Sequence, residues 1–266
     1  RRNGGPQGRV YRGVLNPQVS GTQAMLAYAS KNAVIAHNDW LSFVGASKHY
    51  RLPKRIDALM HSPISRTYRQ ASVEIKLEKT TDYLLTSLQL PASFQPANSK
   101  VEPPYKTHGL IPGRKGYQQH LWHAILARDC HVFVNHPGAS FDMSESRPGF
   151  WYGNGVLPYL VQKGSKIIQI FNIPDWHPIL FTHAHWPTDI FDLQVMENQW
   201  AFGRKGNGCV ALWCSTALKV CSEVLTAREL RAEGQVVAWV GICGSGDLDA
   251  FVASRHAEQP DFDANT

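Results

Sequence analysis

The stretch WAFGRKGNGCVALWCS, residues 200–215, contains two apolar runs separated by a glycine-rich segment. The runs are WAFGR and CVALWCS, and short apolar runs bounded by glycine are typical of β-strands. The intervening GRKGNG has a weak likeness to a phosphate loop but lacks its Gly-Lys-Ser/Thr ending, and a tight β-turn explains it better. The stretch therefore predicts two strands joined by a turn.

The same pattern extends outward along the chain. Ser72–Leu77 (SVEIKL) and Thr81–Leu90 (TDYLLTSLQL) alternate apolar and polar residues at the strand period, which places Val73, Ile75 and Leu77 on one face. Further strand candidates are HVFVNH, KIIQIFNI, ILFTHAH and VVAWVGI. Helical segments do not alternate regularly with these strands, as a parallel sheet would require. The sequence predicts a mainly β fold, a large antiparallel β-sandwich with a few short helices.

Three segments have helical composition, namely Thr22–Ser30, Leu225–Ala232 and Asp247–Ala257. Ser245 and Asp247 are the two candidates for the N-cap of the last helix. The first nine residues are rich in Gly, Pro and Arg and predict a flexible start, so we expect the sandwich domain to span residues 10–263. Residues 91–116 are rich in Pro, Ser and Gly and predict a long loop or flap. The chain begins without Met, and we expect it to be the C-terminal part of a larger protein.

Composition limits the class of protein. With 266 residues, 43% of them hydrophobic, the chain can bury a substantial core in one large domain. Its formal net charge of +6 comes from scattered basic residues, which argues against a nucleic-acid partner and is compatible with an anionic sugar substrate. The five cysteines show no metal or disulfide-scaffold spacing, and no apolar run is long enough to span a membrane.

The motif FTHAHWP, residues 181–187, is the sharpest local signal. On a strand, His183 and His185 point to the same side, where they could bind a sugar hydroxyl, relay a proton or ligate a metal. A divalent metal would need a third ligand, for which His136, Asp189 and Asp192 are candidates. We assign no metal, and an ion at His183 and His185 stays an open alternative. So does a plain structural role for two hydrogen-bonded histidines.

Two further motifs add polar and aromatic groups. In NHPG, Asn135 and His136 stand at the end of a strand, where the following proline holds the histidine rigidly enough for acid–base or sugar-binding work. A turn that satisfies backbone groups is the alternative. The motif RPGFWYGNG offers a carboxylate-binding cation, stacking aromatics and a glycine-flanked amide, which are Arg147, Trp151, Tyr152 and Asn154.

The order of these motifs, with SRTYRQASVEI, GYQQHLWHAIL and FGRKGNG, resembles the C-terminal sandwich region of heparinase II/III-like polysaccharide lyases and related uncharacterised carbohydrate-active proteins. The resemblance covers roughly Val10 to Asp263. It implies a β-sandwich joined to an upstream (α/α) toroid, with an acidic polysaccharide or oligosaccharide bound between them. The toroid supplies a catalytic Tyr or His in those lyases and is missing here. The chain also departs from the pattern at Tyr159, where Arg is usual, and at Cys209, where Tyr is usual.

We therefore expect the sandwich domain of an enzyme acting on uronate-containing polysaccharide by β-elimination. The expected catalytic residues are His136, His183 and Arg147. The expected substrate-binding residues are Asn135, Trp151, Tyr152, Asn154, His185 and Trp186. One alternative is a glucuronide hydrolase of similar architecture, which would use two carboxylates from Asp142, Glu145, Asp189 and Asp192. The other is a non-catalytic carbohydrate-binding or structural module.

Overall fold

The computed structural model describes residues 54, 55, 58, 62–70, 73–89, 121–137, 156–175, 177, 179–221 and 228–263. The chain divides into two compact units, Arg1–Ile64 and Ser65–Thr266. Most of the first unit lies outside the described residues, and so does the predicted helix Thr22–Ser30. The predicted loop at residues 91–116 is also outside them. The predicted domain limits, 1–9 and 10–263, stay predictions.

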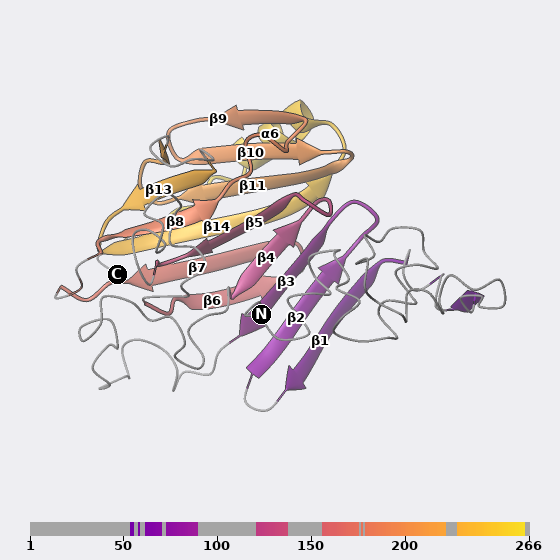
Figure 1. Ribbon diagram of the computed structural model, residues 1–266, viewed down its shortest axis with the longest axis horizontal. Coiled ribbons are helices and arrows are strands. Elements are labelled where there is room, and N and C mark those ends of the chain that lie inside the picture. Colours follow the sequence, from indigo (N-terminus) through magenta and orange to yellow (C-terminus); the bar gives the residue numbers. More distant parts are fainter. Residues whose placement is uncertain are drawn as a thin grey trace, which may run out of the picture. The chain divides into compact units, whose positions relative to one another are not determined.

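The second unit is built on two antiparallel sheets (Figure 1). Across the eight-stranded sheet the order is β1 (Ile64–Gln70), β2 (Val73–Lys79), β3 (Leu84–Gln89), β4 (Trp122–Ile125), β5 (His131–Asn135), β8 (Phe181–His185), β13 (Glu229–Glu233) and β12 (Lys219–Cys221). Across the six-stranded sheet it is β6 (Tyr159–Lys163), β7 (Lys166–Asn172), β14 (Val236–Ser245), β11 (Gly208–Cys214), β10 (Trp200–Lys205) and β9 (Leu193–Met196). The prediction of a mainly β sandwich is confirmed.

The hairpin of β10 and β11 has the form that its sequence predicts. Lys205 pairs with Gly208, so that Gly206 and Asn207 form a two-residue connection. Gly206 has a φ of 60°, a conformation that glycine adopts without steric cost. Alternate residues of the hairpin face opposite sides of the sheet, and residues 200–203 and 208–214 are buried on both sides.

One predicted helix is correct and one is wrong. The helix α6 spans Leu248–His256, and the carboxylate of Asp247 caps it by accepting from the backbone N–H of Ala250 at 3.0 Å. Leu225–Ala232 was expected to be helical, but Glu229–Ala232 lies in strand β13. Pairing with β8 overrides the local preference of Leu, Ala, Arg and Glu for a helix.

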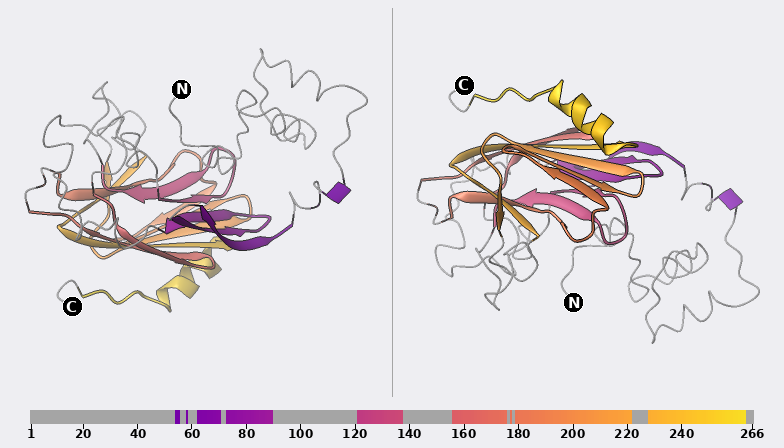
Figure 2. Two further views of the ribbon diagram at one scale, coloured as in Figure 1. Left: turned by 90° about the horizontal axis from the view of Figure 1, so that it is seen from below. Right: turned by 90° about the horizontal axis from the view of Figure 1, so that it is seen from above.

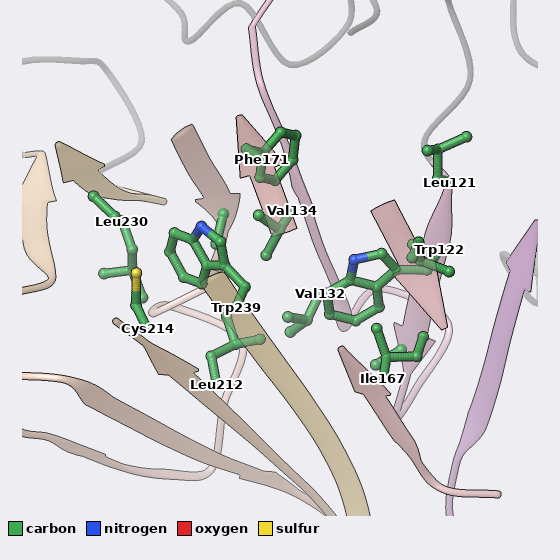
Figure 3. Packing of buried hydrophobic residues seen from close by; sticks show 14 of the residues in the cluster. Leu121, Trp122, Val132, Val134, Ile167, Phe171, Leu212, Cys214, Leu230 and Trp239 are labelled. Atoms are coloured by element: carbon green, nitrogen blue, oxygen red, sulfur yellow. The ribbon is translucent and has the colours of Figure 1, made fainter. Parts of the chain in front are cut away.

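The hydrophobic core lies between the two sheets. Figure 3 shows Trp122 of β4 and Trp239 of β14 among aliphatic side chains from both sheets, including Val132, Ile167 and Leu212. All five side chains are nearly or fully buried. The inner faces of the two sheets are therefore packed against each other.

Side-chain hydrogen bonds cross this core from one sheet to the other. The indole nitrogen of Trp122 donates to Gln169 at 2.7 Å, and that of Trp239 donates to Thr182 at 2.8 Å. The hydroxyl of Ser87 donates to the side-chain oxygen of Gln162 at 2.6 Å. Because a buried polar group without a partner is costly, these bonds fix how the two sheets are aligned.

The outer face of the six-stranded sheet carries a second apolar cluster beneath α6. Figure 2 shows the helix lying on this face, away from the eight-stranded sheet. Leu248 and Phe251 of the helix pack against residues of β10, β11 and β14. Gly244 allows the close approach, because a Cβ there would lie 2.6 Å from the ring of Phe251.

Candidate functional site

The polar candidates gather on the outer face of the eight-stranded sheet, around β8. The inward residues of this strand are Thr182, which bonds to Trp239, and Ala184, which belongs to the core. Strand alternation therefore directs Phe181, His183 and His185 outward. The expectation that both histidines share one side of a strand agrees with this arrangement.

His183 is bonded to a carboxylate from the neighbouring strand. Its Nδ1 lies 2.6 Å from Oε1 of Glu229 on β13, and both side chains are fully buried. Nε of Arg231, which is directly opposite His183 in the strand register, lies 3.1 Å from the same oxygen. The guanidinium also lies over the ring of Phe181, 4.4 Å from its centroid. Arg231 reaches solvent, with 20% of its side chain exposed.

The protonation states follow from burial and from these contacts. Burial lowers the pKa of His183 below its usual value, although the hydrogen bond and charge of Glu229 act in the opposite direction. Burial alone would raise the pKa of Glu229, but the hydrogen bonds and positive charge of His183 and Arg231 outweigh it and lower that pKa. Glu229 is thus a carboxylate held beside Arg231, and His183 is a neutral imidazole.

This pairing also fixes the tautomer of His183. An ionised carboxylate can only accept, so Nδ1 of His183 carries the proton that it donates to Glu229. The lone pair of the neutral ring is then on Nε2, the nitrogen that can take up a proton or accept a hydrogen bond. An imidazole oriented by a carboxylate is a common acid–base arrangement, since the carboxylate also stabilises the imidazolium once it forms.

Asn135 and His185 lie beside this pair and make different contacts. Asn135 on β5 is fully buried and directly opposite His183 in the register. His185 directs Nδ1 to the carbonyl oxygen of His131 at 2.8 Å and stacks on Phe133, with ring centroids 5.1 Å apart. Burial lowers the pKa of His185 to about 4, so this ring is also neutral near neutral pH.

His136 immediately follows β5 and belongs to a neighbouring cluster. Its Nε2 lies 2.9 Å from the carbonyl oxygen of Ile179, and its ring meets His177 edge to face at 4.4 Å between centroids. Burial, and then the charge of His177, lower the pKa of His136 to about 3, and a smaller part comes from His183. His183, 47 residues away in sequence, is therefore close enough to affect the pKa of His136.

Trp186 packs in the core rather than on the outer face. Its indole is fully buried, lies 4.7 Å from the ring of Phe191 between centroids, and donates to Gln194 at 3.2 Å. The remaining expected site residues, Arg147, Trp151, Tyr152 and Asn154, lie outside the described residues. So do Asp142 and Glu145.

The described carboxylates that a hydrolase would need are held in ion pairs. Asp189 binds Arg228 through both of its oxygens, and Asp192 accepts from Lys205 at 2.7 Å. The hydrogen bond from Arg228 lowers the pKa of Asp189, and that from Lys205 lowers the pKa of Asp192. Within the described part of the chain, no three His, Cys, Asp or Glu side chains are grouped so that they could hold a metal ion.

Glu229 and Arg231 are site residues that sequence reasoning missed. The segment ELRAE, residues 229–233, places Leu230 and Ala232 on one face and charged residues on the other. That alternation at the strand period was the available signal, and the high helix propensity of the same residues concealed it.

Comparisons of the chain with models of protein families, with curated proteins and with solved structures find no match. Among the described residues, no helix has the length and apolar character that crossing a membrane requires. The class of protein that the structure itself defines is a two-sheet antiparallel β-sandwich with a buried histidine–carboxylate pair on the outer face of its larger sheet.

Proposed function

We propose that this chain is the sandwich domain of a carbohydrate-active enzyme that cleaves uronate-containing polysaccharide by β-elimination, with His183 as a proton-transfer residue. The observation that carries the proposal is the bond between His183 and Glu229. It supplies a neutral, oriented imidazole beside Asn135 and Arg231, which come from two other strands.

The chemistry of β-elimination has three requirements. A base takes the proton at C5 of the uronate, the electron pair of that C–H bond forms the C4–C5 double bond, and the C4–O4 bond breaks. The leaving oxygen takes up a proton, and the uronate carboxylate must be neutralised while charge develops at C5. A histidine that is neutral near pH 7 has the protonation state that the base requires.

The chain offers groups for each of these roles. His183 serves as the base, and Glu229 stabilises the imidazolium that forms when the proton is taken up. Arg231, whose guanidinium reaches solvent beside the pair, and Arg147 are the cations proposed to neutralise the uronate carboxylate, together with the amide of Asn154. His136 is proposed for orientation or for the second proton transfer. Trp151 and Tyr152 are the proposed sugar platforms, and Asn135 and His185 the polar contacts.

A non-catalytic module is the second candidate, and one observation favours it. The side chains of Asn135, His136, His183 and Glu229 are fully buried, as a polar cluster that holds β5, β8 and β13 together would be. No comparable observation favours a glycoside hydrolase, because the ion pairs of Asp189 and Asp192 keep both carboxyl groups ionised and unsuited to act as a general acid.

The test is to incubate the full chain with a series of polyuronates and glycosaminoglycans and to follow the ultraviolet absorbance of the unsaturated uronide. We expect product from at least one polymer, and its loss in His183→Ala. The matched control is His256→Ala, which removes an exposed histidine of α6 that is bonded at 2.8 Å to Glu197, in the connection between β9 and β10. That variant should retain turnover.

Two results would decide against elimination. Saturated products would indicate hydrolysis rather than elimination. Absence of product from every polymer, with retention of the protein on one of them in affinity electrophoresis, would support the binding module. A fold check by far-ultraviolet circular dichroism on each variant separates loss of the site from loss of structure.

A further inference from the structure

We propose that the outer face of β6 and β7 is a surface through which two copies of this chain associate. Tyr159 and Val161 on β6 and Ile168 on β7 are 39%, 60% and 51% exposed. Val161 is directly opposite Ile168 in the register, and Tyr159 is opposite Ile170. These four side chains, the apolar block, therefore form one contiguous patch on a single face.

The helix α6 covers only part of this face, and side chains beyond the helix are exposed. Along one row that crosses three strands, the exposed fraction is 9% at Val240, 51% at Ile168 and 60% at Val161. Single exposed apolar residues are ordinary, whereas a contiguous patch marks a surface that binds something. The apolar block is as apolar as the part of the sheet that α6 covers. In addition, β6 is an edge strand, and edge strands tend to associate with other chains.

One end of the apolar block is basic. Lys163 and Lys166 are opposite each other in the register and follow the block on the same face. Lys166 is bonded to Glu258 at 2.6 Å. Lys163 has no carboxylate partner among the residues that the structure describes, so its charge is available to a binding partner.

The other end of the same face is acidic. After Glu258 the chain runs over the outer face of the six-stranded sheet, as both views in Figure 2 show. Phe262 packs on the same apolar cluster as Ile170, and the exposed Asp261 precedes it. The segment after Glu258, the tail, thus runs from Lys166 toward Ile170 and brings the negative charge of Asp261 to that end of the block.

With a basic group at one end and an acidic group at the other, this face is complementary to itself. We therefore infer that its binding partner is a second copy of the chain. In a two-fold interface the same patch meets itself in opposite directions. The apolar block of one copy then covers that of the other, and Lys163 of each copy faces the partner's Asp261. A stable interface buries about 800 Å² on each side, which is more than the four side chains of the apolar block supply. The block would therefore form the centre of the interface, and the lysines and the tail would form its rim.

The test is sedimentation or light scattering of the full chain at concentrations from about 1 to 200 µM, a range suited to micromolar association. We expect dimers that dissociate in Val161→Lys and in Ile168→Lys. Val161 is the more exposed of the two, so V161K should fold even if I168K does not. The control is Val220→Lys, at a position 50% exposed on the edge strand β12, which should leave the dimer intact.

A charge exchange tests the orientation. Lys163→Glu and Asp261→Lys should each raise the dissociation constant several-fold, and the double variant should recover most of the loss. A monomer at every concentration, a dimer that V161K leaves unchanged, or a double variant weaker than either single one would overturn the proposal. Binding of a different protein by a chain that stays monomeric would also overturn it.

Discussion

The indole nitrogen of Trp239 on β14 donates to the hydroxyl oxygen of Thr182 on β8 at 2.8 Å, and so joins the two sheets through the core. Both side chains are fully buried. Replacing Thr182 by Val keeps the shape and removes the acceptor, which leaves a buried N–H without a partner. We expect the free energy of unfolding to fall by about 1–3 kcal/mol, measured by urea denaturation.

Thr86→Val is the control for this change. Thr86 is 5% exposed on β3 of the same sheet, and no hydrogen bond of its side chain is found within the described residues. The same substitution there should change stability by less than about 1 kcal/mol. Equal losses in the two variants would mean that the cost comes from replacing a buried threonine and not from the bond to Trp239.

Glu229→Gln tests the buried charge group beside His183. The amide keeps the size of the carboxylate but removes the negative charge that balances Arg231, which is 3.1 Å away. Breaking a buried ion pair on one side is strongly destabilising, and we expect a loss of about 3 kcal/mol in the free energy of unfolding.

The comparison for E229Q is Glu197→Gln. Glu197 pairs with His256 at the surface, where such pairs contribute within about 1 kcal/mol. A small effect at both positions would argue that Glu229 is protonated in the folded protein, contrary to the lowered pKa that His183 and Arg231 give it.

The histidine–carboxylate pair illustrates what the sequence could and could not reveal. The alternation in FTHAH is enough to place His183 and His185 on one face, because the strand period decides it. The partner of His183 is Glu229, 46 residues later, and no local spacing indicates that β13 lies beside β8. The residues of β13 also favour a helix, so the local signal pointed away from the strand that completes the site.

The start of α6 is a feature that local sequence could predict, whereas the position of Trp186 is one that it could not. Of the two candidates for the N-cap of α6, Ser245 and Asp247, the structure shows Asp247; this could be predicted because capping depends on residues that are close in sequence. From its place beside two histidines, Trp186 is expected to be a substrate-binding residue. Its burial is decided by Phe191 and by the opposite sheet, and neither can be read from the motif.

Acidification should destabilise the fold before the carboxylates are protonated. Burial lowers the pKa of His185 to about 4 and that of His177 to about 4, from an ordinary value of 6.5. The unfolded chain binds these protons below pH 6.5 while the folded chain does not. Stability is therefore fully present above pH 6.5 and decreases as the pH falls toward 4, by up to about 3 kcal/mol for each such group.

His185→Gln is the variant that isolates one of these groups. An amide can still donate to the carbonyl oxygen of His131 but does not titrate, so the slope of unfolding free energy against pH between 6.5 and 4 should become shallower. Parallel profiles for H185Q and the parent would show that His185 does not contribute to the acid sensitivity.

Gly244 and Phe251 set the distance between α6 and the six-stranded sheet. A Cβ on residue 244 would lie 2.6 Å from the phenyl ring, so Gly244→Ala must push the ring or the helix away. We expect the free energy of unfolding to fall by about 1–3 kcal/mol, measured by urea denaturation, and amide exchange in α6 to become faster, since overpacking strains the contact.

Phe251→Leu shortens the side chain that blocks the new methyl group, at the cost of its own packing. Because the two positions touch, the double variant should lose less stability than the two single losses added together. Additive losses would mean that the helix does not rest on Gly244 and that its contact with the sheet is made elsewhere.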